Sequence, residues 1–156
     1  MKPIIDFTIE TAKETEWDNI ACLHRDTSVS TTWSFKKQKM GDLKIRHLRF
    51  KEQKIFRENV ATCLNLSMCG NFVFIGYDSG HVDKFNVQSG LFRGTLSHSG
   101  DGPAHPGSRV QAIVTDGLNQ LVITADDEKK IRAWRFSTNK LLKGKMIFII
   151  HFYRLS

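Results

Sequence analysis

The stretch that decides the fold runs from Leu121 to Phe136 and reads LVITADDEKKIRAWRF. Residues 121–125 are a short apolar run, residues 126–130 are polar, and residues 131–136 alternate between apolar and polar side chains. Alternation with a period of two is typical of a half-buried strand, and a polar break between two such runs is typical of a turn. The stretch therefore predicts a β-hairpin with Trp134 on its second arm.

The runs around this hairpin repeat its pattern. Residues 110–115 precede an Asp-Gly turn, and residues 141–142 follow another polar cluster. The same succession occupies residues 60–96, and a degenerate copy has its central arms at residues 20–24 and 29–35. Trp33, Phe85 and Trp134 mark copies spaced about fifty residues apart, a period typical of repeat architectures.

The apolar residues of the middle copy lie on both faces of the expected sheet. Residues 72–75 read FVFI, so successive side chains on opposite faces are all apolar. Such a sheet must be covered on both sides by further sheets, as in a propeller. The sequence therefore predicts an all-β fold, a partial β-propeller with two to three four-stranded antiparallel blades.

The last copy resembles a WD repeat, because Thr124 and a small residue precede an acidic turn and the following strand closes on Trp134. Blades of that family contain a buried polar network of His, Ser or Thr, Asp and Trp, which needs a partner for every member. The other copies depart from the pattern, since Phe85 has no ring N–H and the copy with Trp33 offers no clear acid. Matched residue by residue, the resemblance assigns the network to His105, Thr124, Glu128 and Trp134, with Glu in place of Asp.

Longer strings carry a narrower resemblance. Residues 16–21 (EWDNIA), 69–72 (CGNF), 79–83 (SGHVD) and 116–121 (DGLNQL) are similar to the WD repeat-containing protein 36 / U3 small nucleolar RNA-associated protein 21 family. This resemblance implies a non-catalytic scaffold subunit of the small-subunit processome, in the U3 ribonucleoprotein. Its place is then the nucleolus, in ribosome biogenesis and the processing of 18S ribosomal RNA precursor. The implied partners are other processome proteins and, directly or indirectly, U3 RNA and precursor ribosomal RNA, with no cofactor, membrane or small-molecule substrate.

The length bounds the architecture. A complete propeller has at least four blades, so we expect these 156 residues to be a fragment or a truncated isoform of a longer protein. Uncovered sheet faces would make it marginally stable or self-associating. The expected parts are an approach segment (1–18), a degenerate first blade with a basic connector (19–58), a second blade (59–97), an inter-blade loop (98–108), a third blade (109–144) and a divergent apolar tail (145–156).

Positive charge is concentrated in one segment. The chain has 23 Lys and Arg against 16 Asp and Glu, a net charge of +7, which favours acidic partners or nucleic acid. The segment either contacts RNA phosphates or is an outer strand and loop whose charges protect a sheet edge. Its basic residues are Lys36, Lys37, Lys39, Lys44, Arg46, Arg49, Lys51, Lys54 and Arg57.

No catalytic pattern is diagnostic. The three cysteines lack metal-ligand spacing and are expected to be reduced thiols. The pairs His24 with Asp26 and His81 with Asp83 lack further ligands, and no nucleophile motif occurs. No signal sequence and no apolar run long enough to span a membrane is present. We therefore predict a non-enzymatic protein without a cofactor. The alternatives are a WD-repeat adaptor in another pathway, such as a ubiquitin-ligase receptor or trafficking scaffold, or direct RNA binding through residues 36–57.

Overall fold

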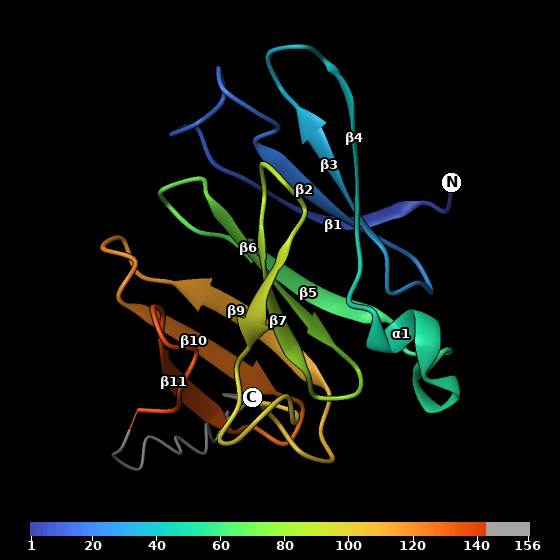
Figure 1. Cartoon of the computed structure of the whole chain (residues 1–156), viewed down its shortest axis with the longest axis vertical. Helices are drawn as coiled ribbons and strands as arrows, with labels where there is room; N and C mark the ends of the chain where they lie inside the picture. Colours follow the sequence, from blue (N-terminus) through green and yellow to red (C-terminus); the bar gives the residue numbers. More distant parts are fainter. Residues whose placement is uncertain (143–156) are drawn as a thin grey trace, which may run out of the picture.

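The computed structural model describes residues 1–142, so the predicted tail at 145–156 and the end of the predicted third blade lie outside the described residues. The chain forms three antiparallel sheets that follow one another in sequence and stack side by side (Figure 1). Two short helical turns, α1 (Arg49–Glu52) and η1 (Lys54–Phe56), connect the first sheet to the second. The predicted all-β class and the stack of short antiparallel sheets are confirmed.

Each sheet is a meander in which strands adjacent in sequence are paired. Blade 1 contains β1 (Ile4–Ile9), β2 (Ile20–His24), β3 (Ser30–Ser34) and β4 (Lys39–Ile45). Blade 2 contains β5 (Ala61–Leu66), β6 (Phe72–Tyr77), β7 (Val82–Asn86) and β8 (Phe92–Thr95). Blade 3 contains β9 (Val110–Thr115), β10 (Leu121–Asp126) and β11 (Ile131–Arg135).

The hairpin predicted from residues 121–136 is confirmed. β10 and β11 pair antiparallel, with Leu121 opposite Arg135 and Ile123 opposite Ala133. β9 pairs with the other side of β10. Within the described residues blade 3 has three strands rather than four, and Leu141 makes only an isolated bridge to Trp134.

The approach segment predicted at residues 1–18 requires a correction. Residues 4–9 are strand β1, which pairs with β2 and places Phe7 opposite Cys22. The signal was present in the sequence, since Ile5, Phe7 and Ile9 alternate with polar side chains at the period of a strand. Blade 1 therefore begins before residue 19 and has four strands.

The first strands of the three blades lie beside one another. The Leu66 amide donates to Thr8 Oγ1 at 3.3 Å, which joins β5 to β1. On the other side of β5, the Thr115 amide donates to Asn65 Oδ1 at 3.1 Å. The first strands therefore lie side by side in the order β1, β5, β9, while β4 and β8 are at the opposite edges of their sheets.

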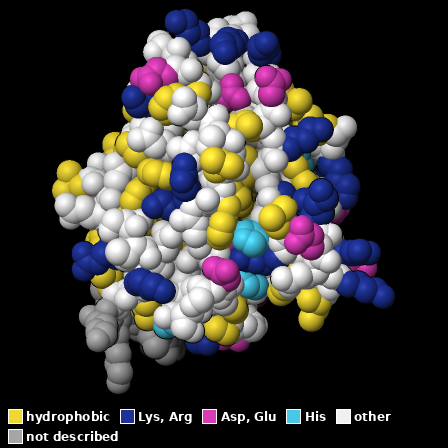
Figure 2. Space-filling model, viewed as in Figure 1, with side chains coloured by type: hydrophobic (Ala, Val, Ile, Leu, Met, Phe, Trp, Pro, Cys, Tyr) yellow, Lys and Arg dark blue, Asp and Glu magenta, His cyan; other side chains and the backbone are white. Residues whose placement is uncertain are grey.

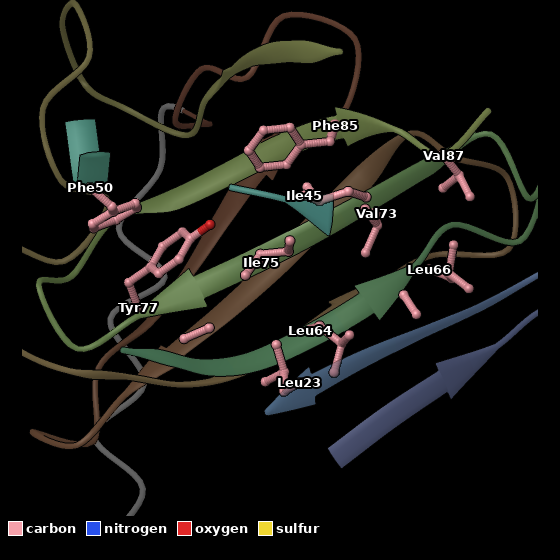
Figure 3. Packing of buried hydrophobic residues seen from close by; sticks show 12 residues of the cluster. Leu23, Ile45, Phe50, Leu64, Leu66, Val73, Ile75, Tyr77, Phe85 and Val87 are labelled. Carbon is pink, nitrogen blue, oxygen red and sulfur yellow. The ribbon is translucent and has the colours of Figure 1, made fainter. Parts of the chain in front are cut away.

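Blade 2 is covered on both faces, as its sequence predicts. Val73 and Ile75 pack with Leu23 and Ile45 of blade 1, and Figure 3 shows them facing one another across the two sheets. Phe74 lies on the opposite face and packs in a second cluster with residues of blade 3. The two-residue period of β6 thus supplies both interfaces.

Large apolar side chains are exposed on the outermost blades. On β1, Ile5 is 49% and Phe7 64% exposed, and on β9 Val114 is 53% exposed. Apolar sheet faces of this kind are covered by neighbouring blades in a propeller. Among residues 1–142, no helix has the length and apolar character needed to cross a bilayer.

Candidate functional site

Four buried side chains, three from blade 3 and one from the loop that precedes it, form one chain of hydrogen bonds. Trp134 Nε1–H donates to Thr124 Oγ1 at 2.8 Å, and Thr124 Oγ1 lies 2.7 Å from His105 Nε2. His105 Nδ1 lies 2.8 Å from Asp126 Oδ2. Burial lowers the pKa of His105, so its ring is neutral near pH 7. The neutral ring donates from Nδ1 to the carboxylate and accepts the Thr124 hydroxyl proton at Nε2, which gives every polar atom a partner.

The acid of this network is Asp126, which corrects the assignment to Glu128. The strand β10 continues through residue 126, and its burial alternates so that Val122, Thr124 and Asp126 all face inward. Glu128 lies in the following turn, where its carboxylate is exposed and pairs with Lys130. The two-residue alternation of Val122 and Thr124 reaches Asp126 next, and this pattern in the sequence identifies Asp126 as the acid.

The loop at residues 98–108 delivers His105 to the network from outside the sheet. The His105 amide donates to the Gly80 carbonyl at 3.0 Å, so the loop is tied to the β6–β7 turn of blade 2. Gly80 has a φ of +80°, and a Cβ there would lie 2.0 Å from the His105 carbonyl oxygen. Only glycine permits this close approach, which sets the position of the imidazole ring.

Blade 1 has a related network that the sequence did not reveal. Trp33 Nε1–H donates to Thr31 Oγ1 at 2.9 Å, and that oxygen lies 2.8 Å from His24 Nε2. The other ring nitrogen of His24 lies 2.8 Å from the carbonyl oxygen of Lys2. A backbone carbonyl thus takes the place of the acid that this copy lacks.

Blade 2 replaces the tryptophan network with a buried ion pair. Arg49 Nη1 donates to both carboxylate oxygens of Asp83, at 3.0 and 2.9 Å. Arg49 Nη2 donates to Thr95 Oγ1 at 3.0 Å, and the Thr95 hydroxyl donates to Asp83 at 2.7 Å. Burial raises the pKa of Asp83 to about 6, while Arg49 and Thr95 oppose this shift. Arg49 comes from the connector, so the pair fastens α1 to β7 and β8.

The ion pair also corrects one member of the basic segment. Arg49 is 5% exposed and both terminal nitrogens of its guanidinium are bonded inside the protein, so it is not available to RNA. Its neighbours in sequence gave no sign of this, because Asp83 lies 34 positions further along the chain. The other predicted basic residues are all exposed, namely Lys36, Lys37, Lys39, Lys44, Arg46, Lys51, Lys54 and Arg57.

The exposed cations fall into two groups at opposite ends of β4. Lys36 and Lys37 lie in the β3–β4 turn, and Arg46 lies beyond the far end of the strand. A seven-residue strand separates its ends by roughly 20 Å. Figure 2 shows Lys and Arg side chains at the top of this face, above the β3–β4 hairpin, and along its right side near α1. At the hairpin end, Lys37 and Lys39 line a hollow of about 350 Å³ together with Glu16, Asp18 and Asp42, so that end carries charges of both signs.

A further buried cation joins blade 2 to blade 3. Lys84 is 5% exposed, and its ammonium donates to the Phe136 carbonyl at 2.8 Å. The ammonium also lies 4.5 Å from the ring centre of Phe72 and 4.3 Å from that of Phe136. Burial lowers the pKa of this amine. The sequence places this lysine between Asp83 and Phe85, and only the tertiary structure shows the aromatic rings around it.

The three cysteines are free, and Cys22 and Cys63 are buried. His24 and Asp83, considered as metal ligands, are engaged in the networks described above. Within residues 1–142, no group of three or more His, Cys, Asp or Glu side chains is placed to hold a metal ion.

Comparison with known proteins identifies relatives along nearly the whole chain. The family model described as the WDR36/Utp21 second β-propeller domain matches residues 1–150. The human protein WD repeat-containing protein 36 is 37% identical over 142 residues, which are 91% of this chain and 15% of the human protein. The U3 small nucleolar RNA-associated protein 21 homolog of Schizosaccharomyces pombe is 29% identical over 133 residues, 83% of this chain and 13% of that protein.

A second fungal protein gives the same result. The U3 small nucleolar RNA-associated protein 21 of Saccharomyces cerevisiae is 29% identical over 143 residues, 92% of this chain and 14% of that protein. The chain thus spans at most 15% of the length of these relatives.

Proposed function

Because this chain belongs to the WDR36/Utp21 family, within its second β-propeller domain, we propose that it acts as a non-catalytic scaffold of the small-subunit processome. In this role it takes part in ribosome biogenesis in the nucleolus and in the processing of 18S ribosomal RNA precursor. The observation that carries the proposal is similarity over 91% of the chain to a member of this family. The printed names of the two fungal relatives describe association with U3 small nucleolar RNA.

The arrangement of the buried polar residues supports a scaffold. His105, Asp126, Arg49 and Asp83 are buried side chains of types that often serve in catalysis, and each is enclosed with its partners inside a blade or between a blade and a connecting segment. Their hydrogen bonds position sheets and a connector. The exposed turns and outer strands are then held on a rigid frame, which is how such proteins present binding surfaces.

The experiment is depletion of the gene product that contains this chain, followed by hybridisation analysis of ribosomal RNA precursors. We expect unprocessed precursor to accumulate and mature 18S RNA to fall, while the large-subunit RNA serves as the internal control. Re-expression of the wild-type sequence restores 18S RNA. Normal 18S maturation after complete depletion would reject the assignment.

Co-purification separates this proposal from a WD-repeat adaptor in another pathway. A tagged chain in its native protein is recovered under mild salt, and the bound RNA is probed for U3. Recovery of U3 RNA together with processome proteins is the expected result. A ubiquitin ligase or a trafficking complex recovered in their place would favour the adaptor.

Direct RNA contact is a second candidate function, favoured by the exposure of the basic side chains in the first group. We infer that Lys36, Lys37 and Lys39 contact phosphates from the exposed β3–β4 hairpin. Each neutralised phosphate contact steepens the salt dependence of binding. Filter binding of a single-stranded RNA over a salt series is therefore the test, with the triple glutamine variant at these lysines expected to bind more weakly and with a shallower slope. An unchanged slope would eliminate RNA contact at this hairpin.

A further inference from the structure

Three large, exposed apolar side chains line a single hollow at the outer edge of blade 2. Leu48 is 61%, Leu91 57% and Phe92 40% exposed. They border a cavity of about 300 Å³ between the connector and β8, with Phe85 also in its lining. We call this cavity the rim pocket. Arg46 and His47 also line the rim pocket.

The position of the rim pocket separates it from the other exposed apolar residues. Ile5 and Phe7 lie on β1 and Val114 lies on β9, on the two outermost blades of the stack. The rim pocket instead lies where blade 1 already packs on blade 2, beside β8, the last strand in the order of its sheet. A blade added to either end of the stack would leave it uncovered, so another occupant is needed to bury these side chains.

The walls of the rim pocket are held in place from behind. His47 packs edge-on against Phe92, with ring centres 4.4 Å apart. The next residues of the connector are anchored by the Arg49–Asp83 ion pair, whose two side chains are 4% and 0% exposed. Burial and the nearby Arg49 lower the pKa of His47 to about 4, so its ring is neutral and adds an apolar wall. A preformed pocket costs a ligand less ordering free energy than a flexible one.

The charges around the rim pocket are mainly positive. Arg46 lines it, and Arg93 follows Phe92 on β8 and is exposed. Lys51 and Lys54 lie on the helical turns that continue the connector, and both are exposed. The exposed acids of the same region are Glu52, Glu58 and Asp101, and Arg57 is a further exposed cation, so cations are in excess. Electrostatic complementarity therefore favours a partner with negative charges beside an apolar anchor.

We propose that the rim pocket is the docking site for an acidic peptide segment of a partner protein, which inserts one large apolar side chain between Leu48, Leu91 and Phe92. Arg46 pairs with a carboxylate beside the anchor, and the exposed Arg93, Lys51 and Lys54 add to the positive charge of the surrounding surface. The inference deepens the proposed scaffold function, on which it rests, by naming the chemistry of a partner. RNA fits the pocket less well, because aliphatic side chains form two of its walls and Phe85 and Phe92 meet edge to face rather than as an open stacking platform.

The probe is a fluorescein-labelled peptide of about twelve residues in which Glu and Asp surround a central Leu-Phe pair. It is titrated with the complete 156-residue chain and binding is followed by fluorescence anisotropy. One twin peptide has Gln and Asn in place of the acids, and a second has Ser-Ser in place of Leu-Phe. We expect saturable binding of the acidic apolar peptide, at least fivefold weaker binding of the first twin and no saturable binding of the second.

Matched variants place the binding site. Leu91→Ser and Arg46→Glu should each weaken peptide binding about tenfold or more. Leu118→Ser is the apolar control, since Leu118 is 76% exposed at the β9–β10 turn, and Arg135→Glu is the charge control at an exposed position on β11 of blade 3. Both controls should bind as the wild type does. Equal binding by the wild type and Leu91→Ser, or by the Leu-Phe and Ser-Ser peptides, would overturn the proposal.

Two further measurements keep the test decisive. If a variant loses its cooperative thermal unfolding, amide chemical-shift mapping on the wild type replaces it, and shifts confined to residues outside the rim pocket would reject the site. A twelve-residue uridine RNA is titrated in parallel, and binding of this RNA but not of the peptide, sensitive to Arg46→Glu, would assign the pocket to RNA instead. None of these readouts depends on ribosomal RNA processing, so failure here is distinguishable from failure of the scaffold proposal.

Discussion

The sharpest prediction concerns two acids separated by one residue. Asp126 accepts a hydrogen bond from His105 Nδ1 at 2.8 Å and another from the Lys130 amide at 2.8 Å. Asp126→Ala leaves both donors without their acceptor, one of them inside blade 3. Leaving a buried donor unpaired costs about 1–3 kcal/mol, so we expect a loss of about 2–5 kcal/mol in the free energy of unfolding. Glu128→Ala removes only an exposed ion pair and should leave stability unchanged within error.

The assay is equilibrium unfolding in urea at pH 7, followed by intrinsic tryptophan fluorescence. For a chain of this size, a loss of about 3 kcal/mol lowers the midpoint by roughly 1–2 M urea. Asp126→Asn retains an oxygen that can accept from His105, so its midpoint should fall between those of the wild type and Asp126→Ala. Similar slopes for all variants would show that the midpoints report stability.

The outcome that would refute the reasoning is equally specific. Equal losses for Asp126→Ala and Glu128→Ala would mean that the hydrogen bonds of the buried network do not determine the stability of blade 3. A larger loss for Glu128→Ala would return the acid of the network to the turn. Either result would contradict the positions of the two carboxylates.

Three further predictions follow from the contacts between blades. Arg49→Met leaves Asp83 buried and without its cation and should cost about 3–5 kcal/mol in urea unfolding. Lys51→Met, two residues away and exposed, should not move the midpoint. Lys84→Met removes the ammonium that contacts the aromatic rings and the Phe136 carbonyl, and it should lower the free energy of unfolding by about 1–2 kcal/mol. Thermal unfolding of this variant at the wild-type temperature would contradict the prediction. Burial lowers the pKa of His81 to about 4, below its unfolded value, so its contribution is complete above pH 6.5 and is lost as pH falls from 6.5 towards 4. Asp83, whose pKa is raised, changes stability in the opposite direction, and its effect is the same in the wild type and in His81→Gln. His81→Gln should therefore lose about 1 kcal/mol less stability than the wild type between pH 7 and pH 5. An equal loss in the two proteins would refute the assignment.

Local patterns in the sequence were sufficient for the strands. The alternation in residues 121–136 and the turn residues around it define β10, β11 and their register without reference to any other part of the chain. The apolar residues on both faces of β6 likewise required a sheet on each side. The same two-residue period is present in residues 4–9, where it predicts β1. In β10 it extends from Val122 and Thr124 to Asp126, which it places on the buried face. Both features are local and can be predicted from the sequence.

The contacts between blades could be decided only by the tertiary structure. Nothing near Arg49 in sequence distinguishes it from the exposed cations on either side, because its partners Asp83 and Thr95 come from strands that pack on the connector only after both blades have formed. The rings around Lys84 and the pocket between Leu48 and Phe92 likewise join residues far apart in the chain. A two-residue period specifies which face of a strand is buried. Which charged or aromatic side chains of the neighbouring sheet contact that face depends on how whole sheets stack. Side chains of the same type therefore became a buried ion pair, an inter-blade cation and a free surface charge according to their tertiary surroundings.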